Sequence, residues 1–520
     1  MSNYSLPASL YRADQVRELD RLAIENHHIP GLELMNRAGR FTFRMLRKFH
    51  PAINEICVVC GSGNNAGDGY IIAGLAKQRG YQVTLFYCSE PSKLKGDAQS
   101  AYQFSMSNNV EARVFSLDSW QQEIASQAAD QIVFIDALLG TGLKGGVRKN
   151  YQVAIHCLNK HPAPVIAVDI PSGLSADTGL PMGCAVEAEI TATYIGLKQG
   201  LFTGQAACYC GEVVFDDLGV PEKVYSHFKA NAQKLDLASL VSAFPSRRAD
   251  AHKGHFGHVL IVGGDQGFGG AVLMAAEAAV RVGTGLTSVV THPDHISAML
   301  TRRPEVMVRG ISNSGIVHPE ALDDLLSAAS VVVIGPGLGQ SDWSKCLLKQ
   351  VLKTECPLVV DADALNILSQ IQKNDLEQIF YRDNWILTPH PGEAARMLGV
   401  STQDIQQNRF EAVQALQKKW GGEVILKGSG SLISHGSKTE PSISLCDAGN
   451  PGMASGGMGD VLSGILGGLL AQQLPLEFAA KLGVCVHATA ADIAAKQQGE
   501  KGLLATDLIP HVRALLNGRY

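Results

Sequence analysis

The chain has 520 residues, too many for one ordinary domain, and two or three domains are expected. With 46% hydrophobic residues, 18% charged residues and a net charge of −5, its composition is that of a globular protein. This mild acidity disfavours a nucleic-acid or anionic-membrane surface as the main partner. The N-terminus has no basic head followed by an apolar stretch, and no apolar run approaches the ~18 residues of a membrane span.

The eleven cysteines are scattered along the chain. Cys57 and Cys60 form a C-x-x-C, which is found in redox and zinc sites, but they lie within an apolar run and no second pair has zinc-like spacing. We expect both to be buried as small apolar residues. The predicted compartment is reducing and cytoplasmic.

From residue 54 to 170, apolar runs alternate with helical stretches. The runs are "EICVVC", "YQVTLFYC", "QIVFIDALLGTG" and "PVIAVDIPSGL". This alternation predicts an α/β fold with a Rossmann-like, doubly wound parallel sheet. Because the carboxyl ends of such strands form the ligand crevice, Asp136 and Asp169 should face the same crevice as residues 61–69.

Between about 220 and 250 the pattern weakens into a polar stretch with two prolines, and a second α/β series then begins with "HVLIVGGDQGFGG". No repeat relates the two series, which favours fusion over duplication. The predicted domains are residues 1–225 and 235–520.

The first glycine loop, "CGSGNNAGDGY" at 60–70, formally matches the dinucleotide fingerprint G-x-G-x-x-G/A. A tight strand-to-helix turn would give the same pattern. A dehydrogenase would also need an acid ending the second strand, and here none occurs before Glu90. The polar side chains offer another interpretation. Asn65, Asp136 and Ser172 each follow a strand end and together could supply oxygen ligands to a hard cation, although each alone could be a loop hydrogen-bonder or a helix cap.

The loops "GSGNNAGDG", "DALLGTGL" and "VDIPSGL" resemble those of the NAD(P)H-hydrate epimerases over residues 10–220. That family interconverts the R and S epimers of NAD(P)HX, the nicotinamide cofactor hydrated at ring carbon 6. The resemblance implies that Asp169 is the acid/base and that Asn65, Asp136 and Ser172 hold K⁺. It also implies that the substrate contacts Asp169 and the residues Asn64, Asn65, Ala66, Gly67, Asp68, Gly140, Thr141, Gly142, Leu143, Lys144, Gly145 and Gly146.

Two details bear on that resemblance. The family usually has glycine where this chain has Ala66, a substitution that the dinucleotide fingerprint tolerates. Epimerising an aminal carbon needs proton transfer and a transient cationic or ring-opened species, and a carboxylate such as Asp169 can serve both. A purely structural Asp169 is the alternative.

Near the C-terminus, "GGMGDVLSGILGGLLA" places glycines at the start of an apolar helix, where free N–H groups and the helix dipole bind phosphate oxygens. Asp460 follows Gly459 directly. A carboxylate beside bound phosphate is unfavourable unless it does chemistry, such as accepting the proton of an attacking hydroxyl. A helix-capping role for Asp460 is the simpler alternative.

The motifs "GPGLG", "DADAL", "LTPHPGEAARML", "LKGSGSLI" and "GNPGMASGGMGDVLSGI" resemble NAD(P)H-hydrate dehydratase, a ribokinase-like α/β domain, over residues 235–515. In that family a nucleotide phosphorylates the 6-hydroxyl of the S epimer and phosphate is then eliminated. The resemblance implies Asp460 as catalytic base. It implies substrate contacts from Ala271, Gly337, Gly339, His390 and Asp460, and nucleotide contacts from Lys427, Gly428, Ser429, Gly430, Ser431 and Gly459.

The resemblance favours ADP over ATP, because fused members are generally bacterial and use ADP, while Mg²⁺ is inferred only from nucleotide chemistry. His390 lies between prolines in a rigid turn, so a hydrogen-bonded loop residue is the alternative to a substrate contact. Glu393 is expected to cap the following helix.

Together these features predict a bifunctional enzyme for the repair of NADHX and NADPHX. We expect a homo-oligomer with no nucleic-acid or membrane partner. One alternative is a ribokinase-type small-molecule kinase with a Rossmann-like regulatory half. Another is an N-terminal half that is a non-catalytic binding module.

Overall fold

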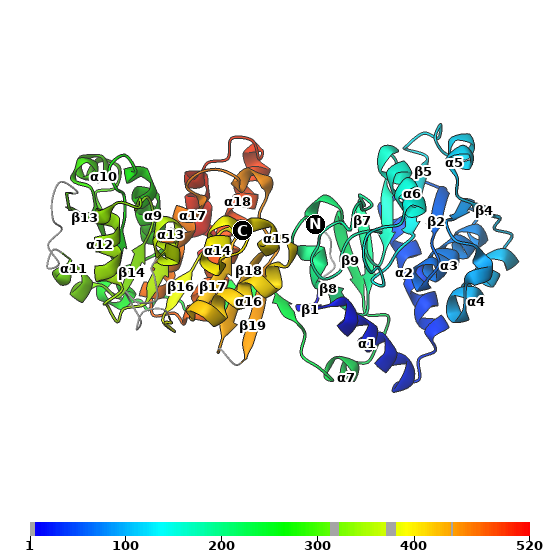
Figure 1. Ribbon diagram of the computed structural model, residues 1–520, viewed down its shortest axis with the longest axis horizontal. Helices are drawn as coiled ribbons and strands as arrows, with labels where there is room; N and C mark the ends of the chain where they lie inside the picture. Colours follow the sequence, from blue (N-terminus) through cyan, green and yellow to red (C-terminus); the bar gives the residue numbers. More distant parts are fainter. Residues whose placement is uncertain (1–5, 313–321, 371–380, 438–439, 520) are drawn as a thin grey trace. The chain divides into compact units, whose positions relative to one another are not determined.

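A computed structural model describes residues 6–312, 322–370, 381–437 and 440–519 (Figure 1). The chain divides into two compact units, an N-terminal unit at Met1–Gln233 and a C-terminal unit at Lys234–Tyr520. Each unit has its own sheet and its own buried core.

The N-terminal unit is built on strands and helices that alternate as the sequence predicts. Its strands are β1 Ser9–Tyr11, β2 Glu55–Cys60, β3 Gln82–Tyr87, β4 Ala112–Val114, β5 Ile132–Ala137, β6 Val165–Val168, β7 Ile190–Tyr194, β8 Leu197–Lys198, β9 Glu212–Asp216 and, at the unit boundary, β10 Ala232–Lys234. Its helices are α1 Ala13–Glu25, α2 Gly31–Phe49, α3 Asn64–Gln78, α4 Gly96–Ser107, α5 Leu117–Glu123, α6 Lys149–Lys160 and α7 Glu222–Tyr225.

The main sheet of this unit has the order β4-β3-β2-β5-β6-β7-β9, with every pair parallel. β5 is buried along its whole length, as expected for a parallel strand covered by helices on both faces. The chain runs outward from β2 in one direction and from β5 in the other, so the switch point lies between these two strands. Ligand crevices form there in open α/β sheets. The predicted doubly wound sheet is confirmed, and Cys57 and Cys60 are buried in β2.

The C-terminal unit is also built from strands that alternate with helices. Its strands are β11 His258–Val262, β12 Leu286–Thr291, β13 Met307–Gly310, β14 Val331–Ile334, β15 Leu358–Val360, β16 Trp385–Leu387, β17 Glu423–Leu426, β18 Ser431–Gly436 and β19 Pro441–Cys446. Its helices are α8 Leu237–Ala243, α9 Gly269–Val282, α10 Ile296–Arg302, α11 Asp323–Ala328, α12 Asp342–Val351, α13 Ala362–Gln370, α14 Pro391–Leu398, α15 Thr402–Gln407, α16 Arg409–Trp420, α17 Met458–Ala471, α18 Leu476–Gln498 and α19 Leu508–Leu516.

The strand order in this unit is β13-β12-β11-β14-β15-β16-β17-β18-β19, parallel from β13 to β17 and antiparallel through β18 and β19. Its switch point lies between β11 and β14, so the loops after these strands face one crevice. Helices α9, α17, α18 and α19 form much of the core.

Helix α18 is long and apolar enough to span a membrane by length and composition, although the sequence pattern shows no uninterrupted apolar run of that length. In the structure, 67% of its apolar window is buried inside the protein, and it contributes to the same core as α17. It is therefore an interior helix of the C-terminal unit.

Candidate active sites

The N-terminal unit has a cavity of about 620 Å³ at its switch point. It lies where the loops after β2 and β5 meet the inner faces of α1 and α2. From the predicted substrate set, the residues lining it are Asn64, Asn65, Asp68, Gly140, Thr141, Gly142, Leu143, Lys144, Gly146 and Asp169. Loops that are far apart in sequence thus converge on one space large enough for a small molecule.

Three residues of the predicted set, Ala66, Gly67 and Gly145, do not line this cavity. Ala66 is fully buried within α3. Gly67 packs under α2, where an added Cβ would lie 2.5 Å from the Met35 sulfur. Gly145 is exposed in the loop after β5. Most of the predicted set therefore faces the cavity, while Ala66 and Gly67 pack within the helix behind it.

Asp169 lies directly after β6 with a left-handed backbone, at φ +68°. A non-glycine residue in that region is strained, and such strain clusters at functional sites. Its carboxylate forms an ion pair with the buried Lys198, and the Thr193 hydroxyl lies 3.3 Å from the same oxygen. Lys198 also donates to Thr193 Oγ1 at 2.9 Å and to the Tyr194 carbonyl at 3.2 Å. The Asp169 carboxylate is therefore held in place at the cavity wall.

Two further carboxylates, Asp20 and Asp68, line the same cavity as Asp169 and Lys198. Burial, reinforced by the charge of Asp169, raises the pKa of Asp20 to about 6. Burial and the neighbouring charges of Asp169 and Asp20 raise the pKa of Asp68 well above its usual value. Asp20 and Asp68 therefore hold their protons more tightly than exposed carboxyl groups do.

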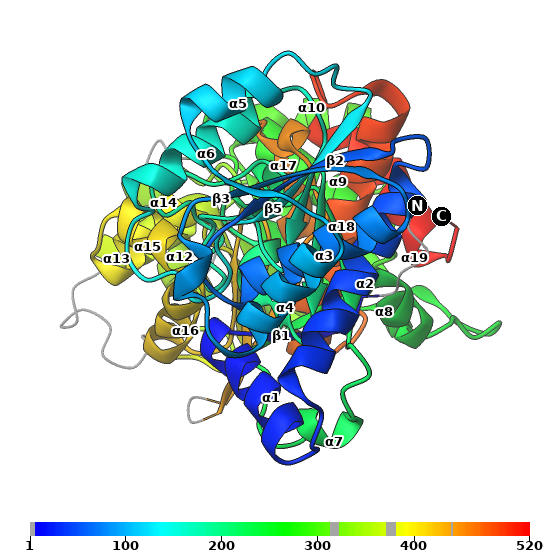
Figure 2. The same cartoon turned by 90° about the vertical axis from the view of Figure 1, so that its right-hand side faces the viewer.

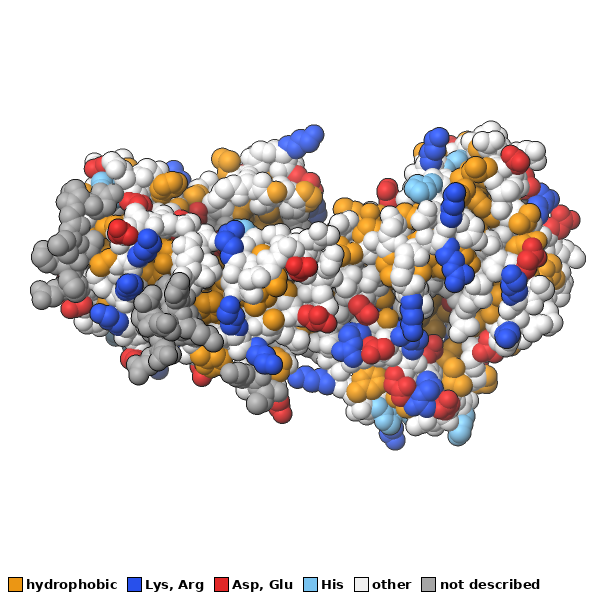
Figure 3. Space-filling model, in the orientation of Figure 1, with side chains coloured by type: hydrophobic (Ala, Val, Ile, Leu, Met, Phe, Trp, Pro, Cys, Tyr) orange, Lys and Arg blue, Asp and Glu red, His pale blue; other side chains and the backbone are white. Residues whose placement is uncertain are grey.

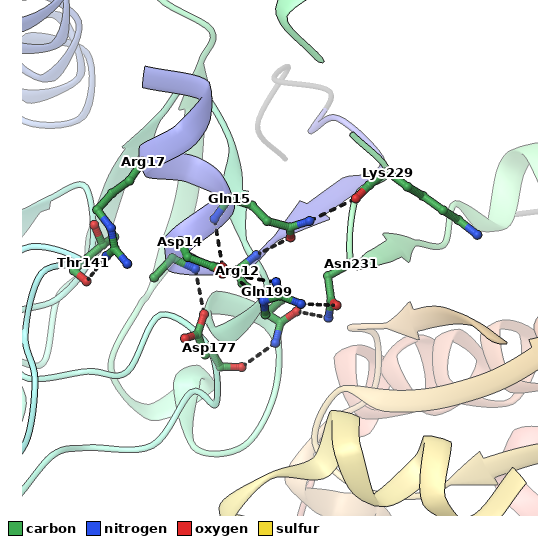
Figure 4. A network of polar contacts seen from close by, with 10 residues as sticks. Arg12, Asp14, Gln15, Arg17, Thr141, Asp177, Gln199, Lys229 and Asn231 are labelled. Atoms are coloured by element: carbon green, nitrogen blue, oxygen red, sulfur yellow. Dashed lines mark hydrogen bonds and ion pairs between the residues drawn. The ribbon is translucent and has the colours of Figure 1, made fainter. Parts of the chain in front are cut away.

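Asp20 reaches this cavity because α1 is anchored at its first turn (Figure 4). The Ala13 amide donates to Asp177 Oδ1 at 2.7 Å, and the Gln15 side chain donates to the Lys229 carbonyl at 3.0 Å. One turn further on, Arg17 donates to the Thr141 carbonyl at 3.1 Å and so joins α1 to the loop after β5.

The predicted cation ligands Asn65, Asp136 and Ser172 are all buried. Asp136 accepts from the Ser172 amide at 2.7 Å and from the Ser172 hydroxyl at 2.6 Å, and it lies behind the cavity rather than on its wall. Burial raises the pKa of Asp136 to about 6, against the opposing effect of these hydrogen bonds. The Asn65 carboxamide, which does line the cavity, has no hydrogen-bond partner among the described residues. A buried amide oxygen without a partner is an available oxygen ligand for a hard cation.

In the C-terminal unit, a partly buried ion pair lies under the start of α17. Lys427 Nζ is 2.8 Å from Asp361 Oδ1, and the Ser463 hydroxyl donates to Asp361 Oδ2 at 2.8 Å. Burial disfavours the charged form of Asp361, but the Lys427 ammonium outweighs it and lowers the pKa of this carboxyl. A Cβ at Gly459 would come within 3.2 Å of Asp361 and 3.3 Å of Lys427, so glycine leaves this pair accessible from above.

Asp460 lies in the first turn of α17, beside the same pair. Burial and the charge of Asp361 raise the pKa of Asp460 to about 7, with Lys427 opposing. The N-cap position of α17 is Gly457, which has no side chain to cap the helix, and Asp460 lies three residues further on. A carboxylate with a pKa near 7 is suited to general-base chemistry.

The predicted nucleotide loop, Lys427 to Ser431, connects β17 to β18. Arg409, buried in α16, donates to the carbonyls of Leu426, Lys427 and Gly430 at 3.2, 3.3 and 3.2 Å. The Ser431 hydroxyl donates to the Gly428 carbonyl at 3.1 Å, and Ser429 lies between them. The hydrogen bonds from Arg409 therefore fix the loop backbone, while the Lys427 side chain is directed towards Asp361.

The predicted substrate residues Ala271, Gly337 and Gly339 meet at the switch point between β11 and β14. A Cβ at Gly337 would lie 3.0 Å from the Ala271 Cβ. The Gly339 amide donates to Asp363 Oδ2 at 3.0 Å. Ala271 and the "GPGLG" loop thus form one surface.

His390 is the N-cap of α14, and its Nδ1 accepts from the Gly392 amide at 3.0 Å. Glu393 completes a capping box by accepting from the His390 amide at 2.8 Å, as expected from the sequence. Glu393 also lies 3.9 Å from Lys427, which brings this turn to the edge of the Asp361–Lys427 pair. The His390 ring is half-exposed, and burial together with the nearby Lys427 lowers its pKa.

Sequence patterns missed Asp20, Lys198, Asp361 and Arg409. Asp361 had a signal, because it follows the apolar run "PLVV" as Asp136 and Asp169 follow theirs. Asp20 had none, since an acid on an amphipathic helix is ordinarily read as exposed.

Two family models match the chain: NAD(P)H-hydrate dehydratase over residues 259–513 and YjeF-related protein N-terminus over residues 31–200. A bifunctional NAD(P)H-hydrate repair enzyme Nnr of Coxiella burnetii is 46% identical over 98% of this chain and 99% of its own length. The Escherichia coli enzyme of the same name is 40% identical over 99% of this chain and 95% of its own length.

Among solved structures, an ADP/ATP-dependent NAD(P)H-hydrate dehydratase of Bacillus subtilis is 26% identical, with a TM-score of 0.47 over 55% of this chain and 98% of its own. The similarity to whole-length relatives covers both units and therefore both clusters of carboxylates. The chain belongs to the family of bifunctional NAD(P)H-hydrate repair enzymes.

Proposed function

We propose that the N-terminal unit epimerises R-NAD(P)HX to the S form in the cavity that contains Asp169, Asp20 and Lys198. Asp169 donates a proton to the 6-hydroxyl, the bond between carbon 6 and that oxygen breaks, water leaves, and the lone pair of the ring nitrogen stabilises the planar cationic intermediate. Water then adds to the opposite face and returns the proton. Lys198 fixes the Asp169 carboxylate, and the raised pKa of Asp20 makes it a second proton carrier beside the reacting carbon.

A potassium ion fits the oxygens of Asn65, Asp136 and Ser172. The support is the Asn65 carboxamide, which is buried without a hydrogen-bond partner among the described residues, and the buried carboxylate of Asp136. When bound, the ion would supply fixed positive charge beside the substrate. Asp136 would then stay ionised at neutral pH, because a nearby cation opposes the effect of burial on its pKa.

In the C-terminal unit, Asp460 accepts the proton of the 6-hydroxyl of S-NAD(P)HX as that oxygen attacks the terminal phosphate of the nucleotide. With ADP as donor, AMP leaves and the hydrate carries the phosphate. The ring nitrogen then expels phosphate from carbon 6 and a proton leaves carbon 5, which restores NAD(P)H. The start of α17 and the Lys427–Ser431 loop surround the phosphates, as the free N–H groups of a helix N-terminus permit.

We assign Mg²⁺ to the nucleotide phosphates. In the described part of the chain, no group of three or more His, Cys, Asp or Glu side chains is placed to hold a metal ion. The protein groups then position the phosphates, and the ion would neutralise their charge.

The observation that carries this function is the presence of both clusters, Asp169–Lys198 and Asp361–Lys427 with Asp460, in one chain whose relatives match it over its whole length. Spontaneous hydration gives both epimers, and the dehydratase chemistry consumes one of them. We also propose that the protein is cytoplasmic and forms homo-oligomers. A lone sugar-type kinase would not require the Asp169 cavity.

The test uses the whole protein with a mixture of R- and S-NADHX and follows the recovery of NADH absorbance with ADP or with ATP. We expect complete recovery, and faster recovery with ADP. The Asp169→Asn variant should form NADH only from the S-NADHX in the mixture, and the R-NADHX should remain unconverted. Full recovery by that variant at the normal rate would remove Asp169 from the chemistry, and no recovery from pure S substrate by the unaltered protein would refute the dehydratase assignment.

A further inference from the structure

A second cavity of about 550 Å³ lies on the N-terminal unit, between α2, the end of α3 and the segment after β9. Helices α2 and α3 lie side by side in Figures 1 and 2 and are in contact. The cavity is lined by Arg37, Arg40, Phe43, Arg44, Arg47, Leu75, Arg79, Asp216, Leu218 and Gly219. Five arginines and one carboxylate therefore surround a single hollow.

Four of these arginines form a row along one face of α2. Positions 37, 40, 44 and 47 follow helical spacing, while Leu34, Met35 and Ala38 on another face of the helix line the epimerase cavity. Like charges three and four residues apart destabilise a helix. This row therefore opposes helix stability unless something neutralises it.

The protein neutralises only part of this charge. Arg37 pairs with Glu33 at 2.9 Å and donates to the Leu218 carbonyl at 2.7 Å. Arg44 pairs with Asp216 at 3.0 Å. The side chains of the remaining three, Arg40, Arg47 and Arg79, are exposed and form no hydrogen bond or ion pair with the described part of the chain.

The interaction of positive charge with a helix dipole explains the positions of only two of the five arginines. Arg47 is in the last turn of α2 and Arg79 is the C-cap of α3, where a positive charge is favourable. Arg37, Arg40 and Arg44 lie further back in α2, where the dipole gives no such benefit. The convergence of all five on one hollow requires another explanation.

We propose that this arginine cavity binds a small molecule carrying two or more phosphate groups, at a site separate from both catalytic clusters. Guanidinium groups bind phosphate through two parallel N–H bonds, and Arg is favoured over Lys where that geometry matters. Phe43, Leu75 and Leu218 provide apolar lining for a carbon-containing part of the ligand. The cavity volume lies in the range of small-molecule sites.

An extended polyanion fits this site less well than a small one. A nucleic acid or anionic membrane needs a broad basic surface. The chain has a net charge of −5, and on the face shown in Figure 3 basic and acidic side chains are interspersed. Five arginines, in contrast, gather around one hollow.

Leu218 lines both this cavity and the epimerase cavity. Its backbone has φ +56°, and its carbonyl accepts from Arg37. A ligand that draws Arg37 towards phosphate would therefore act on a residue that the two cavities share.

The test probes the whole protein with inorganic tripolyphosphate, by calorimetry and by hydrogen exchange of the peptides covering residues 37–47 and 216–219. Exchange distinguishes this site from the nucleotide site, which also accepts phosphates. We expect protection of these peptides in the unaltered protein. In the Arg40→Glu/Arg47→Glu variant, protection should be lost and affinity at this site should fall at least about tenfold, because two charge-assisted contacts are removed.

The matched control is Lys93→Glu/Lys95→Glu, which makes the same charge change at exposed residues outside the cavity. It should keep both protection and affinity. An Arg40→Lys/Arg47→Lys variant keeps the positive charge but loses the two parallel N–H donors of each guanidinium group. It should bind tripolyphosphate with intermediate affinity. R-to-S conversion checks that each variant is folded.

If the affinity for tripolyphosphate fell equally in the Arg40→Glu/Arg47→Glu variant and in the Lys93→Glu/Lys95→Glu control, the overall charge of the protein would explain the effect. That result would overturn the proposal. Absence of protection at residues 37–47 in the unaltered protein would also overturn it. So would binding to phosphatidylserine vesicles that depends on Arg40 and Arg47 while tripolyphosphate gives no protection, since the site would then be a membrane contact.

Discussion

Replacing Asp460 by asparagine keeps the shape of the side chain and removes its ability to accept a proton. If Asp460 deprotonates the 6-hydroxyl of the S hydrate, the loss of this base should lower the dehydration rate by about 10² to 10⁴. Asp342 provides a matched control, because it lies in the first turn of α12 as Asp460 does in α17 but is fully exposed. Asp342→Asn should leave the rate unchanged.

The same substitution has a predictable effect on stability. The pKa of Asp460 rises from 3.8 to about 7 on folding, chiefly through burial. A group with a raised folded pKa stabilises the native state below its unfolded pKa, and this contribution is lost as pH rises from about 4 through 7. A shift of about three units corresponds to at most about 4 kcal/mol, and partial exposure reduces this through solvent screening. Asp460→Asn should therefore have an equal or higher Tm than the unaltered protein at pH 8, with a smaller difference at pH 5.

The assay follows NADH absorbance from pure S-NADHX with ADP, with thermal unfolding measured at both pH values. A variant that is inactive and no less stable at pH 8 identifies Asp460 as a group maintained for chemistry at the expense of stability. Near-normal NADH recovery would refute the general-base role. A marked loss of Tm at pH 8 would refute the electrostatic reasoning, because the carboxylate would then stabilise the helix start.

Three further outcomes are expected. Asp136→Asn should weaken both potassium dependence and R-to-S conversion while dehydration of pure S substrate continues, and unchanged conversion at limiting potassium would contradict the cation site. Asp20→Asn should slow R-to-S conversion and abolish the fall in rate that the loss of its proton causes as pH rises through about 6; Glu18→Gln, on the same helix, should do neither. A fragment of residues 1–233 should be more stable to heat than one of residues 1–225, because the shorter piece lacks the β10 residues Ala232 and Gln233 that pair with β1, and equal Tm values would show that this pairing is dispensable.

The sequence predicted the two sheets because strongly periodic apolar runs leave few alternatives to a parallel sheet with helices between its strands. The same reasoning located Asp169 and Asp460, since each follows a strand or a glycine loop at a predictable edge. It placed Asp136 in the same crevice, whereas the structure buries this carboxylate behind the wall, bonded to Ser172. A strand-end position fixes the edge of the sheet but not the direction in which the side chain leaves it.

Residues that act from helices were beyond such reasoning. Asp20 reaches its cavity only because the first turn of α1 is tied to Asp177 and Lys229, which are more than 150 residues away in the chain. Arg409 supports the nucleotide loop through three carbonyls, and nothing in its local sequence distinguishes it from a surface arginine of an amphipathic helix. Both roles depend on tertiary contacts that periodicity does not encode.

In both units, an ion pair between a lysine and an aspartate lies beside further acids, although the two sites are built from unrelated strands and helices. In each, one lysine is committed to one carboxylate, Lys198 to Asp169 and Lys427 to Asp361. The neighbouring acids then lie in a partly buried site beside a lysine that is already paired, so that burial and like charge raise their pKa values, to about 6 for Asp20 and about 7 for Asp460. Removing either lysine would therefore do more than break an ion pair. Loss of Lys198 would raise the pKa of Asp20 and Asp68, and loss of Lys427 would raise the pKa of Asp361 and Asp460, because each lysine lowers these values. The pH dependence of that unit's reaction would shift upward, while the reaction of the other unit kept its own profile.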